Sequence, residues 1–176
     1  MRRIATEVGC SPMKLYGYFK DKRELLRLIW EDSLGRVLID LKPVLESDKN
    51  AADRLRAFGV AYVHYWIDHP EEYRVVFMNE DAVAGPEDDY YVYQSDLLER
   101  VDWVQAVVEE GLRSGQFAGG KSAGYTQQFM CLLGGLAHML ITVPELPWQA
   151  HDRLVRDAVN TFVRGMSFSG KGTGTR

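Results

Sequence analysis

Residues 1–27, MRRIATEVGCSPMKLYGYFKDKRELLR, decide how the rest of the sequence is interpreted. They have the pattern of two short helices joined by a tight turn, in which a glycine permits the turn and a serine and a proline begin the second helix. This pattern predicts a helix-turn-helix, whose second helix is free to enter a DNA major groove. The residues that carry it are Ile4, Ala5 and Val8 on the first helix, Gly9 at the turn, Ser11 and Pro12 at the second start, and Leu15 and Phe19 facing the same core.

Beyond this stretch, apolar residues recur at helical spacing and strand patterns are nearly absent. Asp21 and Glu24 form a capping pair that predicts the start of a long helix, which we expect to end at Pro43. Further helices are expected at about 53–68, 70–78, 90–114, 122–143 and 147–168, with a loop over 79–89. We therefore predict an all-α fold with a head over residues 1–28, a body over 29–168 and a disordered tail over 169–176.

Length and composition favour a globular protein in a reducing compartment. A chain of 176 residues that is 46% hydrophobic is long enough to bury a core. Cys10 and Cys131 have no metal-ligand or disulfide-framework spacing, which favours the cytoplasm. The longest apolar run, residues 129–143, falls short of a membrane span, and the first residues do not form a secretory signal.

Charge is divided unevenly along the sequence. Residues 1–30 hold seven basic and three acidic side chains, whereas residues 31–176 hold 14 basic and 22 acidic ones. A head of net charge +4 on a body of net charge −8 favours contact with a polyanion at one end. On charge alone, a solvated cluster is the favoured interpretation.

No pattern for catalysis or for a metal is present. His64 and His69 are five residues apart, which is not the spacing that places two imidazoles on one helical face. The nucleophile and phosphate-loop motifs are missing, and no pair of acids stands out. We predict that the protein is not an enzyme and has no cofactor.

The sequence resembles the TetR (tetracycline-repressor) family of transcriptional regulators. Its signature is similar to Ile4-Ala5-x-x-Val8-Gly9-Cys10-Ser11 followed by Leu15-Tyr16-x-Tyr18-Phe19-Lys20-Asp21-Lys22-x-x-Leu25. The stretch from Ala61-Tyr62 to His69-Pro70-x-x-Tyr73-x-x-x-Phe77 is similar to a ligand-domain subgroup with a His-Pro-x-x-Tyr-x-x-Met-Phe stretch. Two departures are that Met130 and Gly134-Gly135 replace the Trp and His-Gly usual in that subgroup, and that family members usually carry a further helix before the position of Met1. We expect the chain either to be truncated or to bind DNA weakly.

The resemblance implies which residues contact DNA. Pro12, Met13, Lys14 and Gly17 align with positions that face base edges, while Tyr16, Tyr18 and Lys22 align with phosphate contacts. Arg2 and Arg3 begin the preceding helix and are further candidates for phosphate contact. For Met13 and Gly17, an exposed position without a role is the alternative interpretation.

The resemblance also locates a ligand pocket in the body. Its candidate residues are Tyr62, Tyr65, Trp66, Phe77, Asp102, Trp103, Phe129 and Leu133. Aromatic walls with a few polar tips suit a lipophilic molecule, although residues at helical spacing also form ordinary cores. We expect a neutral or cationic ligand, because the body is acidic and these segments carry no arginine cluster.

The last two helices are expected to form a homodimer interface. The resemblance places it there, with Gly134, Gly135 and Ala137 allowing close approach and Leu154, Val155, Ala158, Phe162 and Val163 forming an apolar stripe. The function expected is that of a repressor released from double-stranded DNA by a small-molecule effector. The alternative is a helical dimer that binds a small molecule or a protein without DNA.

Overall fold

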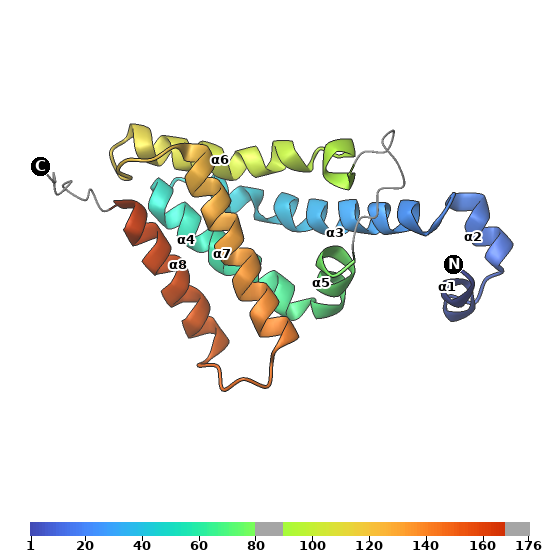
Figure 1. The fold of residues 1–176 in the computed structure, drawn as a ribbon. Helices are drawn as coiled ribbons and strands as arrows, with labels where there is room; N and C mark the ends of the chain where they lie inside the picture. Colours follow the sequence, from blue (N-terminus) through green and yellow to red (C-terminus); the bar gives the residue numbers. More distant parts are fainter. Residues whose placement is uncertain (80–89, 168–176) are drawn as a thin grey trace, which may run out of the picture. The chain divides into compact units, whose positions relative to one another are not determined.

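The structure, a computed structural model, describes residues 1–79 and 90–167. Over these ranges the chain forms α-helices and one short 3-10 helix, and no strand, so the predicted all-α fold is confirmed (Figure 1). No helix in the described part is long and apolar enough to span a membrane. The helices are α1 (Arg2–Glu7), α2 (Pro12–Tyr18), α3 (Lys22–Leu45), α4 (Ala51–Asp68), α5 (Pro70–Phe77), η1 (Tyr91–Gln94), α6 (Leu97–Arg113), α7 (Ser122–Thr142) and α8 (His151–Ser167).

The chain divides into two compact units. Unit 1 consists of Met1–Arg36 and Glu71–Leu98, and unit 2 consists of Val37–Pro70 and Glu99–Arg176. The predicted boundary at residue 28 and the other domain limits stay predictions. The predicted loop over 79–89, except Asn79, and the predicted tail over 169–176 lie outside the described residues.

The turn between α1 and α2 forms as its sequence predicts. Gly9 has a φ of +69°, in the left-handed region where glycine is favoured. The Ser11 hydroxyl oxygen accepts a hydrogen bond from the Lys14 backbone N–H at 3.2 Å, which caps α2. Val8 differs from the expectation, because it follows the last residue of α1 and its side chain is 64% exposed.

The predicted capping pair of α3 is confirmed, but the predicted end of this helix is wrong. The Asp21 carboxylate accepts from the Glu24 backbone N–H at 2.9 Å, and the Glu24 carboxylate accepts from the Lys20 backbone N–H at 2.5 Å. Pro43 lies inside the helix, which continues to Leu45. Proline has no backbone N–H to donate, and its ring disturbs the preceding turn. The two residues after Pro43 nevertheless complete the last turn of the helix.

Three other helix ends differ from those predicted. Asn50 caps α4 by accepting from the Asp53 backbone N–H at 3.0 Å, so α4 starts two residues earlier than expected. The helix expected from Tyr90 is interrupted at Ser95, where η1 ends before α6 begins. The last helix begins at His151 rather than near Pro147.

The core of unit 2 is formed where α4 packs against α7 and α8 (Figure 1). Gly59 makes a close approach possible, because a Cβ at this position would lie 2.9 Å from Cζ of Phe129 and 3.2 Å from Cδ2 of Leu133. The Phe58 ring packs against Tyr62 of α4 and Phe129 of α7. Its centroid lies 5.9 Å from that of Tyr62 and 6.5 Å from that of Phe129. Burial of this aromatic and aliphatic surface is the main stabilising contribution within unit 2.

Candidate functional site

The candidate DNA-contacting residues share the exposed surface of α1, α2 and the start of α3. All nine are exposed to solvent, and Met13 is the most exposed large hydrophobic residue described, at 84%. They are Arg2, Arg3, Pro12, Met13, Lys14, Tyr16, Gly17, Tyr18 and Lys22. Basic, phenolic and apolar groups thus occur together on one short motif, which suits contact with both phosphates and base edges.

The α1–α2 pair buries little of its own surface. Ala5 is fully buried, whereas α2 contains no buried residue, and Leu15 and Phe19 are only partly covered. Exposure of Val8 adds to this incompletely covered apolar side. Few buried contacts predict low local stability for the motif within unit 1.

A contact that sequence reasoning missed holds the first turn of α3. The Tyr91 hydroxyl donates a hydrogen bond to the Arg23 carbonyl oxygen at 2.9 Å, and the Arg23 guanidinium lies 4.9 Å from the Tyr91 ring centroid. The Trp30 ring packs against the same tyrosine, with centroids 6.0 Å apart. These contacts within unit 1 fix the helix start that carries Lys22. No sequence pattern pairs residues so far apart in the chain.

The candidate ligand residues are not gathered in one place among the described contacts. Tyr62, Trp66, Phe129 and Leu133 are buried in the core of unit 2, while Tyr65 is half-buried and packs on Trp66 with centroids 5.1 Å apart. Phe77 belongs to unit 1 and is 43% exposed. Asp102 is exposed on α6, and Trp103 lines a separate cavity. A role for these residues in ligand binding stays a prediction.

A cavity of about 330 Å³ lies in unit 2, between the last turn of α3, the start of α4, and α6. We call it the charged cavity, because basic and acidic side chains line it together with apolar ones. Its lining consists of Lys42, Leu45, Glu46, Arg54, Trp103, Ala106, Val107 and Glu110. Trp103 is the only one of the candidate ligand residues among them.

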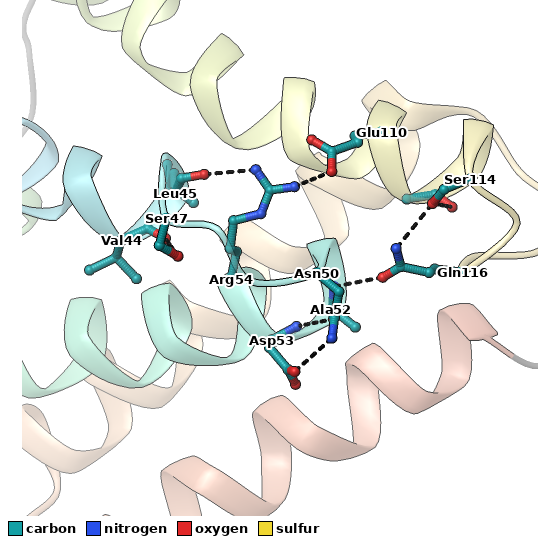
Figure 2. A network of polar contacts seen from close by, with 11 residues as sticks. Val44, Leu45, Ser47, Asn50, Ala52, Asp53, Arg54, Glu110, Ser114 and Gln116 are labelled. Carbon is teal, nitrogen blue, oxygen red and sulfur yellow. Dashed lines mark hydrogen bonds and ion pairs between the residues drawn. The ribbon is translucent and has the colours of Figure 1, made fainter.

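Arg54 lines one side of the charged cavity. Its side chain is 10% exposed, donates to the Leu45 carbonyl oxygen at 3.0 Å and forms an ion pair with Glu110 (Figure 2). It therefore ties the last turn of α3 and the start of α4 to α6. The sequence held a signal for it, because Arg54 precedes Phe58 by four residues and so occupies the apolar face of its helix.

The outward side of α7 and α8 bears an apolar groove of about 410 Å³. Two candidate interface residues, Gly135 and Leu154, line it, and a Cβ at Gly135 would meet no atom within 4 Å. Ala137, Val155 and Val163 are instead buried within the chain, and Gly134, Ala158 and Phe162 are half-buried. The groove is lined by Cys131, Leu132, Gly135, Leu136, Met139, Leu140, Trp148 and Leu154.

No metal site is recognisable in the described ranges, because no three His, Cys, Asp or Glu side chains are grouped to hold an ion. His64 does have an acidic neighbour, with 3.4 Å between its Nε2 and an Asp152 carboxylate oxygen. That contact joins α4 to α8 and contains too few ligands for a metal.

Comparison with known proteins identifies the fold. No family model matches the sequence, and no curated protein matches it significantly. A protein of unknown function from Rhodococcus sp. RHA1 is similar in structure, with a TM-score of 0.75 and 24% identity over 95% of this chain and 84% of that one. A TetR-family regulatory protein from Rhodococcus RHA1 has a TM-score of 0.76 and 20% identity, covering 96% and 86% of the two chains.

A third similar structure is that of FadR from Bacillus subtilis in complex with stearoyl-CoA. Its TM-score is 0.74 and its identity is 15%, covering 92% of this chain and 86% of that one. At these identities the likeness establishes the fold. The chain thus has the all-α fold found in transcriptional regulators of the TetR class.

Proposed function

We propose that this protein is a TetR-like transcriptional regulator that binds double-stranded DNA through α1 and α2 and responds to a small molecule. The observation that carries the proposal is the exposure of the helix-turn-helix, in which all nine candidate contacts are open to solvent. The resemblance of the signature residues and the likeness to a TetR-family structure support it. The net charge of +4 on residues 1–30 adds electrostatic attraction to phosphates.

The candidate residues divide into two kinds of contact. Tyr16, Tyr18 and Lys22 provide hydroxyl and ammonium donors, which suit phosphate oxygens and set the position of the helix on DNA. Lys14, beside Met13 on α2, is suited to a base edge and thereby to sequence preference. Arg2 and Arg3 add phosphate contacts from α1, while Pro12 and Gly17 lie close to the bases.

The proposed regulatory state is a homodimer. Two recognition helices separated by one DNA turn, roughly 34–36 Å, would occupy successive major grooves. The apolar groove of α7 and α8 supports a second copy as its occupant, because apolar surfaces of this kind are usually covered. The protein acts as a repressor if the ligand favours a dimer whose recognition helices have a different separation. A coupling free energy of about 1–3 kcal/mol per ligand is enough to release DNA.

The proposed effector is a small lipophilic molecule. The similar FadR structure contains stearoyl-CoA, which has a lipophilic acyl chain, and this supports an apolar ligand. The expectation that the ligand is not an anion needs revision. The segment Glu71–Leu98 alone holds eight acidic residues and one basic residue, whereas unit 2 holds twelve of each. The acidity that argued against an anion is therefore not a property of unit 2.

A covering helix completes the proposal for the head. The exposure of Val8 and the absence of buried residues on α2 leave an apolar side that an additional amphipathic helix would bury. With this side covered, α1 and α2 would be held more rigidly, which favours DNA binding.

Selection from a pool of random duplexes tests the proposed function. The chain and its extension by any in-frame residues encoded before Met1 are both used, and selected duplexes are compared with random ones. Lys22→Ala should weaken binding to all duplexes similarly, because it removes a phosphate contact. Lys14→Ala should instead reduce the preference for the selected sequence. If no sequence is enriched with either form of the protein, the regulator proposal is wrong.

A further inference from the structure

The charged cavity contains two ion pairs and has no excess of either charge. Lys42 and Glu46 form one pair, with 3.3 Å between Nζ and Oε1, and Arg54 and Glu110 form the other. The rest of the lining is apolar and includes the indole ring of Trp103. The cavity thus offers an apolar wall beside two neutralised pairs, all within unit 2.

A ligand with one net charge would disturb this balance. An anion drawn to Lys42 would separate it from Glu46, and a cation drawn to Glu46 would displace Lys42. Either exchange replaces one ion pair by another at a pair that is largely exposed, so a ligand with one charge gains little net ionic interaction. A ligand with both charges compensates each group that it separates, since its carboxylate pairs with Lys42 and its ammonium pairs with Glu46.

The Lys42–Glu46 pair is the one suited to exchange partners, because its side chains are 41% and 63% exposed. The Lys42 ammonium lies 4.8 Å from the Trp103 ring centroid, so the ring helps to hold Lys42 at the cavity. Arg54 is held by Leu45 and Glu110, but its Nε is buried and has no acceptor in the described residues.

We propose that the charged cavity binds a small zwitterion with an apolar side chain, of the size of a free amino acid. Its volume of about 330 Å³ is at the lower end for small-molecule sites. The ligand's side chain would lie against Trp103 and Val107, with its two charged groups near Lys42 and Glu46. Because the cavity belongs to unit 2, binding does not require that α1 and α2 contact DNA.

Calorimetric titration of the whole chain without DNA separates the charge classes. L-leucine supplies the zwitterion, leucinamide the cation, N-acetylleucine the anion and N-acetylleucinamide the uncharged analogue. We expect leucine to bind at least about tenfold more tightly than each analogue, which corresponds to about 1.4 kcal/mol. Binding of the cation, the anion or the uncharged analogue as tight as that of leucine would overturn the proposal, as would no binding of leucine at its solubility limit.

Two charge variants test the roles of the exchanging pair. Lys42→Gln removes the partner of the ligand carboxylate, so leucine should bind about tenfold more weakly. Glu46→Gln removes the partner of the ammonium and should weaken both leucine and leucinamide. Leucinamide should not lose affinity in Lys42→Gln, because it has no carboxylate. The same loss for both ligands in both variants would contradict these roles.

A variant that fills the cavity locates the site. Ala106 lines the cavity and is exposed, so Ala106→Trp is expected to fold and to block entry. Ala123→Trp is the matched control, since Ala123 is exposed on α7 and lines neither the charged cavity nor the apolar groove. Circular dichroism checks folding in both variants. Leucine binding that survives in Ala106→Trp, or is lost equally in the control, would contradict the location.

Discussion

Arg54 occupies a helix face that is otherwise apolar, and its position depends on two acceptors. Its guanidinium donates to the Leu45 carbonyl oxygen and forms an ion pair with the Glu110 carboxylate. Both partners lie outside α4. A buried arginine is tolerated when it is paired in this way, whereas removal of one partner leaves polar groups without compensation. The side chain thereby connects the ends of three helices in unit 2 (Figure 2).

Arg54→Met is expected to destabilise the protein by about 2 kcal/mol, because it removes hydrogen bonds to a carbonyl and to a charged group. Urea unfolding followed by circular dichroism measures the change. Arg56→Met is the matched control on the same helix, since Arg56 pairs with Asp53 near the surface and such pairs contribute about 0–1 kcal/mol. Equal destabilisation by the two substitutions would contradict the special role of Arg54.

Tyr73 predicts a dependence of stability on alkaline pH. Burial raises the pKa of its hydroxyl above the ordinary value of 10.0. As the pH rises past this value, the unfolded state loses its proton first, so the free energy of unfolding falls. In Tyr73→Phe this part of the decrease should be absent. Urea unfolding of both proteins at neutral pH and above pH 10 measures it, and identical pH profiles would argue against the assignment.

At the scale of single residues, the sequence predicts some features and misses others. The positive φ at Gly9 and the cap at Ser11 were predictable, because both depend on residues within one turn. The hydrogen bond from Tyr91 to Arg23 and the ion pair of Arg54 with Glu110 were not, because they join distant segments. Local signals in a sequence carry little information about such long-range partners.

At the scale of elements, the α1–α2 turn is the feature that most depends on one residue. Gly9→Ala is expected to destabilise the motif by about 1 kcal/mol, because alanine is strained at a φ of +69°. Gly17→Ala is the control, since Gly17 is helical with open space around a Cβ and alanine favours helix. Hydrogen exchange of the α1 and α2 amides should become faster in the first variant and slower in the second. The opposite order would contradict the turn geometry.

The presence of the helices was predictable from the spacing of apolar residues, whereas the residues at which they begin and end depend on particular side chains. Apolar spacing predicted the helices from α3 to α8, because each buries one face. Helix α4 starts early because Asn50 caps it. Helix α3 continues for two residues beyond Pro43, which completes its last turn. For the candidate site, the sequence predicted exposed residues on α2 but not the charged cavity, whose lining comes from three separate helices.

At the scale of the whole molecule, the apolar groove predicts self-association. Gly135→Glu should convert a dimer into a monomer, because it places a charge in the groove without a clash inside the chain. Ala123→Glu, exposed on the same helix outside the groove, should leave the dimer intact. Light scattering after size exclusion at micromolar concentration measures both. A monomeric unmodified protein would reject the interface, and so would dissociation caused equally by the two substitutions.

If the basic head contacts DNA phosphates as proposed, duplex binding depends on salt concentration. Fluorescence anisotropy of a labelled duplex is measured from low to physiological salt, with the chain and with its form extended before Met1. Because bound phosphates release counterions, the logarithm of the association constant should fall linearly with the logarithm of salt concentration. Lys22→Ala should reduce the slope by about one. Absence of salt-dependent duplex binding would contradict contact between the head and DNA phosphates.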